Sequence, residues 1–87
     1  MSMNTAAAVV TFVNATSSGG YLVTLHAEAH QDGSGTVVTL QDPFFVSVPA
    51  GLSAKKADAF VRQNLADAFA AQGVIIDPSD IYVPLTN

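Results

Sequence analysis

Two histidines and a glutamate stand at alternate positions in the first half of the chain, as His26, Glu28 and His30. Imidazole and carboxylate groups are ligands that zinc, manganese and iron accept. In an extended strand, alternate residues face the same side, so these three side chains share one face. Residues two apart on a strand lie about 6.7 Å apart and residues four apart about 13 Å. One ion can therefore contact two neighbouring members of the trio, but not all three.

The same three residues can also be interpreted, without any chemical role, as the polar side of a half-exposed strand. The chain has no further histidine and no cysteine, so a complete ligand set would need oxygen donors from elsewhere. The sequence therefore predicts no metal site and no cofactor, with His26, Glu28 and His30 as weak candidate ligands. A metal-dependent enzyme at His26 and Glu28 is the third hypothesis for function.

Other short motifs predict turns rather than chemistry. Asp77 and Asp80 lack the central glycine and closing glutamate of a calcium-binding EF-hand loop, and they fit a capped turn around Pro78. Gly19–Gly20 lacks the Lys and Ser/Thr of a phosphate loop. A chain of 87 residues also leaves little room for a supported pocket. We expect no catalytic residues and no enzymatic activity.

The elements that position these residues follow from hydrophobic spacing. Extended strands are predicted at residues 6–13, 21–29 and 36–41. At Pro43 either the third strand bends or a separate strand begins, and we favour a bent strand that continues through 44–48. Within the second strand, four apolar residues alternate with four polar ones: Val23, Leu25, Ala27 and Ala29 against Thr24, His26, Glu28 and His30. This alternation is typical of a strand with one buried face.

A single amphipathic helix is predicted between Ser53, which can cap its start, and Gly73, which can end it. Residues 74–76 are expected to form a short strand, and residues 81–85 an extended tail. The predicted fold class is therefore α+β: a two-layer, mostly antiparallel β-meander with one helix on one face, in the order β-β-β-α-β. Residues 1–87 make one domain, with residues 1–5 as a flexible N-terminal segment.

The charge pattern limits the partners. The net charge is −4 and only 11% of residues are charged, about half the usual share. The three basic residues, Lys55, Lys56 and Arg62, fall within the predicted helix, where Asp58 can pair with Arg62. These features argue against nucleic acid. Without a basic leader or a long apolar run, we expect a soluble protein of the cytoplasm or a virion, with no membrane contact.

The first predicted strand is unusual because it has no charged residue or proline to protect its edge. Regular alternation places Val9, Thr11 and Val13 on one face and Val10 and Phe12 on the other. One helix covers only one face of a sheet, so the other face needs a partner. We expect these five residues to be an interaction site and the chain to form a homo-oligomer.

Two functions follow from these expectations. The first is a non-enzymatic structural or assembly subunit that acts through its sheet surface or edge strand, with a phage or virus-like particle as its setting. The alternative is a small acidic binding module, such as an inhibitor, that occupies a partner's basic site with its aspartates. The candidate acidic residues are Asp32, Asp42, Asp77 and Asp80.

Overall fold

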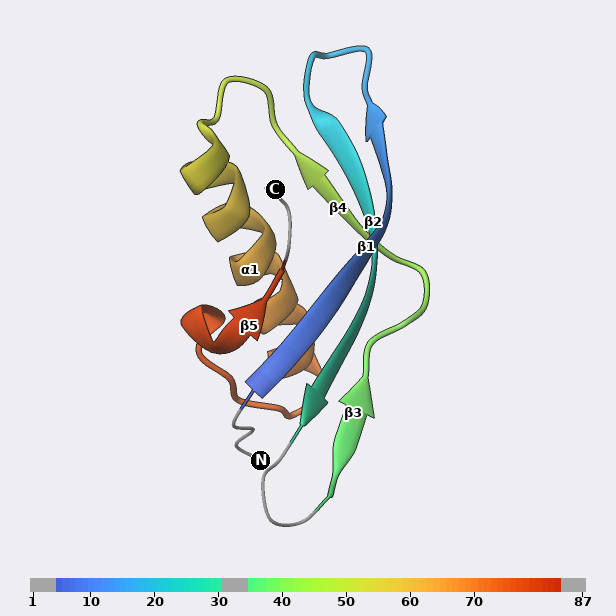
Figure 1. The fold of residues 1–87 in the computed structure, drawn as a ribbon, viewed down its shortest axis with the longest axis vertical. Coiled ribbons are helices and arrows are strands. Elements are labelled where there is room, and N and C mark those ends of the chain that lie inside the picture. The colour runs from blue at the N-terminus through green and yellow to red at the C-terminus, as the bar shows by residue number, and fades with distance from the viewer. Residues whose placement is uncertain (1–4, 31–34, 84–87) are drawn as a thin grey trace.

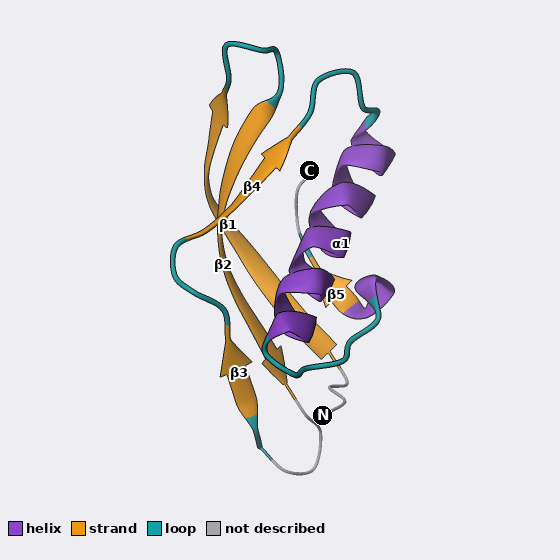
Figure 2. Cartoon of the chain, turned by 180° about the vertical axis from the view of Figure 1, so that it is seen from behind, coloured by secondary structure: helices purple, strands orange, loops and turns teal. Residues whose placement is uncertain are grey.

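The computed structural model describes residues 5–30 and 35–83. Its elements are β1 (Thr5–Ala15), β2 (Tyr21–His30), β3 (Val37–Thr39), β4 (Phe44–Val48), α1 (Ala54–Ala71), the 3₁₀ turn η1 (Pro78–Asp80) and β5 (Ile81–Tyr82). They form a five-stranded, mostly antiparallel mixed sheet with one helix packed against it (Figures 1 and 2). The predicted α+β class is confirmed, with one strand more than expected: β-β-β-β-α-β.

Strand β2 is the central strand of the sheet. It pairs antiparallel with β1 along one side and with β3 and β4 along the other. Its predicted alternation is confirmed, because Val23, Leu25, Ala27 and Ala29 are buried and the residues between them are half-buried. The hairpin between β1 and β2 turns at Gly19, which has a φ of +91°, a conformation that glycine adopts without strain.

The expected single bent third strand is instead two strands. Strand β3 pairs with residues 28–30 of β2, and β4 pairs with residues 21–25. The ladder is interrupted at residues 40–43, where Pro43 has no N–H to donate and the Asp42–Pro43 peptide bond is cis. Leu40 still donates its N–H to the Ala27 carbonyl at 3.0 Å and is buried. The break therefore lies where the sequence predicts it, but it separates two strands.

Strand β1 contains a bulge that the sequence does not predict. Val10 pairs with Leu25 and Phe12 pairs with Thr24, so Thr11 is an extra residue in the ladder. Its hydroxyl donates to the Thr24 carbonyl at 3.1 Å. An extra residue inverts the alternation beyond it. The expected division of faces is therefore wrong after Thr11: Phe12 shares a face with Val9, not with Val10.

The helix is built as its capping residues predict. The Ser53 hydroxyl accepts the Lys56 N–H at 3.3 Å, and Gly73 follows the helix with a φ of +81°. The Asp58 carboxylate pairs with Arg62 at 2.9 Å. The buried residues of α1, which pack against the sheet, are Val61, Leu65, Ala66 and Phe69. No helix in the described part of the chain is long and apolar enough to span a membrane.

The closing strand lies later in the chain than expected. Residues 74–76 form no more than an isolated β-bridge at Ile75, with Val74 and Ile76 buried on either side of this exposed residue. The closing strand is β5, which runs parallel to β1 and pairs only with Ala6 and Ala7. The remainder of the expected tail, from residue 84, lies outside the described residues.

Candidate functional site

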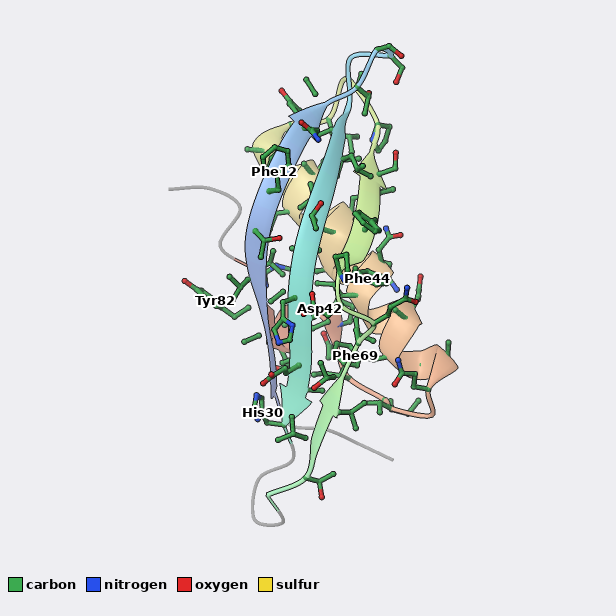
Figure 3. The ribbon with its side chains drawn as sticks, turned by 90° about the vertical axis from the view of Figure 1, so that its right-hand side faces the viewer. Phe12, His30, Asp42, Phe44, Phe69 and Tyr82 are labelled. Atoms are coloured by element: carbon green, nitrogen blue, oxygen red, sulfur yellow. The ribbon has the colours of Figure 1, made fainter. Side chains whose placement is uncertain are left out.

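The two faces of the sheet have different neighbours. We call the side against α1 the inner face and the opposite side the outer face. The helix lies on one side of the sheet only, and among the described elements no other helix covers the outer face (Figures 1 and 2). Figure 3 looks onto the outer face, with α1 behind the strands. Any large apolar side chain on the outer face is therefore left to solvent or to a partner.

Three such side chains lie together on the outer face, and we call them the apolar patch: Val9, Phe12 and Phe45. The register places Phe12 opposite Thr24 and Thr24 opposite Phe45, so the two aromatic residues flank one threonine across three strands. Val9 lies opposite His26 in the neighbouring row. The exposed fractions are 57% for Val9, 58% for Phe12 and 54% for Phe45. More than half of each side chain is thus available for contact.

The patch borders an open strand edge. Beyond Ala7, no strand of residues 5–30 or 35–83 pairs with the second side of β1, so the edge is open from Ala8 to Ala15. This stretch contains no charged residue and no proline. Its one protective feature is the bulge at Thr11, because bulges disturb the regular pairing of an edge. The edge of β1 is therefore a second candidate contact surface beside the outer face.

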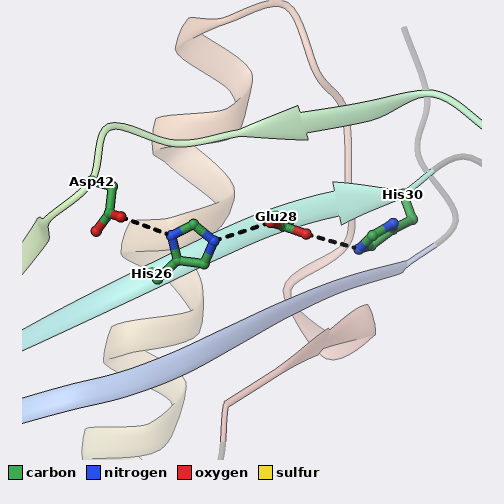
Figure 4. A network of polar contacts seen from close by, with 4 residues as sticks. All are labelled: His26, Glu28, His30 and Asp42. Atoms are coloured by element: carbon green, nitrogen blue, oxygen red, sulfur yellow. Dashed lines mark hydrogen bonds and ion pairs between the residues drawn. The ribbon is translucent and has the colours of Figure 1, made fainter.

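Beside the patch, four ionisable side chains form a row of contacts that we call the histidine–carboxylate network (Figure 4). His26 Nδ1 lies 3.2 Å from Asp42 Oδ2, and His26 Nε2 lies 3.0 Å from Glu28 Oε1. The other Glu28 oxygen lies 3.6 Å from His30 Nε2. Strand β2 supplies three of these residues and the segment between β3 and β4 supplies Asp42. The structure therefore brings the predicted trio together and adds a fourth member.

The network favours a protonated His26. The hydrogen bond to Glu28 is the largest influence on its pKa, and together with the contact to Asp42 it outweighs desolvation, so the pKa of His26 is raised above its usual value. A protonated imidazole donates from both ring nitrogens, which matches a carboxylate oxygen at each of them. This geometry suits an ion pair shared among three groups.

The same contacts bear on the metal hypothesis. Both ring nitrogens of His26 face carboxylate oxygens, so an ion that bound either nitrogen would have to displace a contact now made. In the described portion of the chain, no group of three or more His, Cys, Asp or Glu side chains has an arrangement that could hold a metal ion. The expectation of no metal and no cofactor stays a prediction.

The described acidic residues of the inhibitor hypothesis lie in two different parts of the fold. Asp42 lies in the outer-face network, whereas Asp77 caps η1, which packs against α1. Asp77 Oδ1 accepts the Ser79 hydroxyl at 2.7 Å and the Ser79 N–H at 2.8 Å, and the Ser79 hydrogen bonds lower the pKa of Asp77. Asp80 follows in the same turn, and Asp32 lies outside the described residues. The inhibitor hypothesis stays a prediction, with its described aspartates at two separate positions.

A groove of about 410 Å³ lies between α1 and η1. Lys55, Asp58, Arg62 and Ser79 contribute its polar lining. Arg62 is already paired with Asp58, and the Ser79 hydroxyl donates to Asp77. No histidine lines the groove to activate that hydroxyl. The groove therefore contains no serine–histidine pair.

The sequence analysis does not assign Phe45 and Asp42 to the outer face. Phe45 is exposed between Phe44, which packs against the core, and buried Val46, and the alternation within residues 44–48 carries that signal. Asp42 has no comparable signal, because only the paths of β3 and β4 along β2 bring it to His26. Comparisons of the chain with protein-family models, curated proteins and solved structures found no match.

Proposed function

We propose that this protein is a non-enzymatic structural or assembly subunit that associates with copies of itself through the outer face of its sheet. One observation carries the proposal: Val9, Phe12 and Phe45 are more than half exposed and adjacent on a sheet face that no described helix covers. Contiguous exposed apolar residues mark interaction surfaces in soluble proteins. A repeating particle, such as a phage or virus-like particle, is the setting that we propose for such a subunit.

The dimensions of the outer face suit an interface. The molecule measures 43 × 24 × 22 Å along its principal axes. The outer face, which Figure 3 views, has the longest and the shortest of these dimensions, and the rectangle that they bound covers about 950 Å²; a standard protein–protein interface buries about 800 Å² on each partner. Two copies that meet through this face therefore have sufficient area. The apolar patch would span the width of the contact at this level of the sheet, because Phe12 of β1 and Phe45 of β4 lie on either side of Thr24 of the central strand.

The distribution of charge favours a second copy over a charged partner. The three basic residues of the chain, Lys55, Lys56 and Arg62, all belong to α1, on the other side of the sheet. Strands β1 and β4 carry no charged residue. A face of this kind has no lysine or arginine to attract an acidic or nucleic-acid partner. Its apolar groups are complementary to those of an identical face.

The experiment is sedimentation velocity of the full chain over a range of micromolar concentrations. We expect a dimer or larger species for the wild-type protein. The double variant Phe12→Ser/Phe45→Ser removes both aromatic side chains and should weaken association by at least about ten-fold. Circular dichroism of the same samples establishes that the variant is folded.

Ile75→Ser is the matched control. Ile75 is 61% exposed, much like Phe12, but it lies between α1 and η1. Its replacement should leave the association constant unchanged. A wild-type protein that stays monomeric at these concentrations contradicts self-association, and equal effects of the two sets of substitutions contradict the assignment to the outer face.

A further inference from the structure

His26 occupies a central place on the outer face. It lies in the middle of β2, the strand with neighbours on both sides. Its cross-strand neighbour is Val9 of the apolar patch, and Thr24, two residues away, separates the two phenylalanines. A second copy that covers the patch must therefore also cover His26 and the carboxylates that contact it.

The charged and titratable groups around His26 are few in the described part of the chain. Its own strand contributes Glu28 and, beyond it, His30; the segment after β3 contributes Asp42. Strands β1, β3 and β4 contribute no ionisable side chain. Strand β5 contributes Tyr82, which the register places beyond Ala7 in the row of Glu28. The balance of charge at the centre of the face thus depends on His26 between two carboxylates.

Protonation of His26 changes this balance. With a neutral imidazole, Glu28 and Asp42 give the centre of the face two negative charges; with an imidazolium, one negative charge remains and both carboxylates have a donor. In water the difference is screened. Against a second copy, water is displaced and the same charges are presented by the partner, so unpaired carboxylates become costly. Covering the face therefore favours the protonated form.

We propose that association through the outer face takes up protons at His26, so that the assembly tightens as the pH falls. The inference rests on the proposed function, because it needs the outer face to be the contact surface. In an isologous dimer each copy contributes one network, and two protons are taken up for each dimer formed. The raised pKa of His26 in the isolated chain supports this direction, since its hydrogen bond to Glu28 and its contact with Asp42 already stabilise the imidazolium relative to a free histidine.

The test is sedimentation velocity of the full chain at constant ionic strength between about pH 8 and pH 6, the range in which histidine changes charge. We expect the dimer dissociation constant of the wild-type protein to fall by about ten-fold, because two networks each contribute an interaction of the size of a surface ion pair. His26→Gln, which keeps a polar side chain of similar length but cannot be protonated, should lose most of this dependence.

His30→Gln is the matched control, because His30 lies at the end of β2 and at 3.6 Å from Glu28. It should keep most of the pH dependence of the wild-type protein. Association of the wild-type protein that is equally strong at both pH values overturns the inference and leaves the proposed function standing. A pH dependence that persists in His26→Gln also overturns it, and a monomer at every pH overturns both proposals.

A second readout does not depend on sedimentation. The ring protons of His26 report its protonation in proton NMR spectra, which can be recorded at low and high protein concentration. Linkage requires the titration of His26 to move to higher pH at the concentration where the protein associates. A midpoint that is independent of concentration contradicts coupling between protonation and association.

Discussion

The inner and outer faces of β2 are formed by alternate residues of the same ten-residue strand, but their surroundings differ. On the inner face, Leu25, Ala27 and Ala29 have no exposed surface, and α1 closes over that side of the sheet. On the outer face, His26 and Glu28 are half-buried with no described element above them. Folding accounts for the inner side chains. The stability of the monomer does not explain why large apolar side chains lie exposed beside His26 and Glu28 on the outer face.

Side-chain size follows the same division. Where α1 packs on the sheet, the inner face of β1 presents Ala6 and Ala8, opposite Ala29 and Ala27 of β2. Small residues allow the helix to approach, and the bulk of this core comes from residues such as Phe69 of α1. The outer face of the same sheet exposes large residues at Val9, Phe12 and Phe45. A protein selected only for a soluble fold would place them the other way round.

The largest effect expected from this contrast comes from a pair of phenylalanines. Phe69 has no exposed surface, whereas Phe45 is 54% exposed. Phe69→Ala leaves a cavity in the core and should lower the free energy of unfolding by about 3–5 kcal/mol. Phe45→Ala should cost under about 1 kcal/mol, because surface substitutions disturb little packing. Urea denaturation at concentrations where the protein is monomeric measures both.

Both variants of this pair lose the same atoms, so the comparison needs no correction for chemistry. Similar losses of stability from the two substitutions would mean that Phe45 is covered within the monomer. The outer face would then not be a free surface, and the contrast between the faces would fail.

A smaller effect is expected from a pair of alanines on β1. Ala8 is 1% exposed on the inner face, and its neighbour Ala7 is exposed on the outer face. Ala8→Leu forces extra carbon atoms between sheet and helix and should cost about 1–3 kcal/mol. Ala7→Leu points to solvent and should change stability by less than about 0.5 kcal/mol. Thermal denaturation of the two variants measures this difference between the faces. An equal loss of stability in Ala7→Leu and Ala8→Leu would contradict it.

The parts of this fold that sequence predicts are those set by local patterns. The alternation around Leu25, the caps at Ser53 and Asp77, and the break at Pro43 each depend on residues close together in the chain, and each is confirmed. A cap or an alternation needs no knowledge of the partner strand. For this reason the helix and the central strand can be predicted from the sequence.

The parts that sequence misses depend on pairing between distant segments. The bulge at Thr11 has no glycine or proline to mark it, and it exists only relative to Thr24. The two-residue ladder of β5 is likewise too short to leave a periodic pattern. In the site, regular alternation predicts that Phe12 and Val9 lie on opposite faces of the sheet. The bulge at Thr11 adds one residue to the strand and places Phe12 on the same face as Val9. The sequence therefore indicates that the first strand has exposed apolar residues, but it does not predict which residues form the apolar patch.

The smallest effect concerns the stability of the isolated chain at different pH values. The pKa of His26 is raised in the folded protein, mainly by Glu28. Its stabilising contribution is therefore fully present below the unfolded value, near 6.5, and is lost as the pH rises through the folded pKa. At concentrations that keep the protein monomeric, His26→Gln should lower the urea midpoint slightly near pH 6 and leave it unchanged near pH 8.5. The effect is small because the network lies at the surface. Equal loss at both pH values would show that packing rather than charge accounts for the role of His26, and the outer face would then lack the charge pair on which its pH response depends.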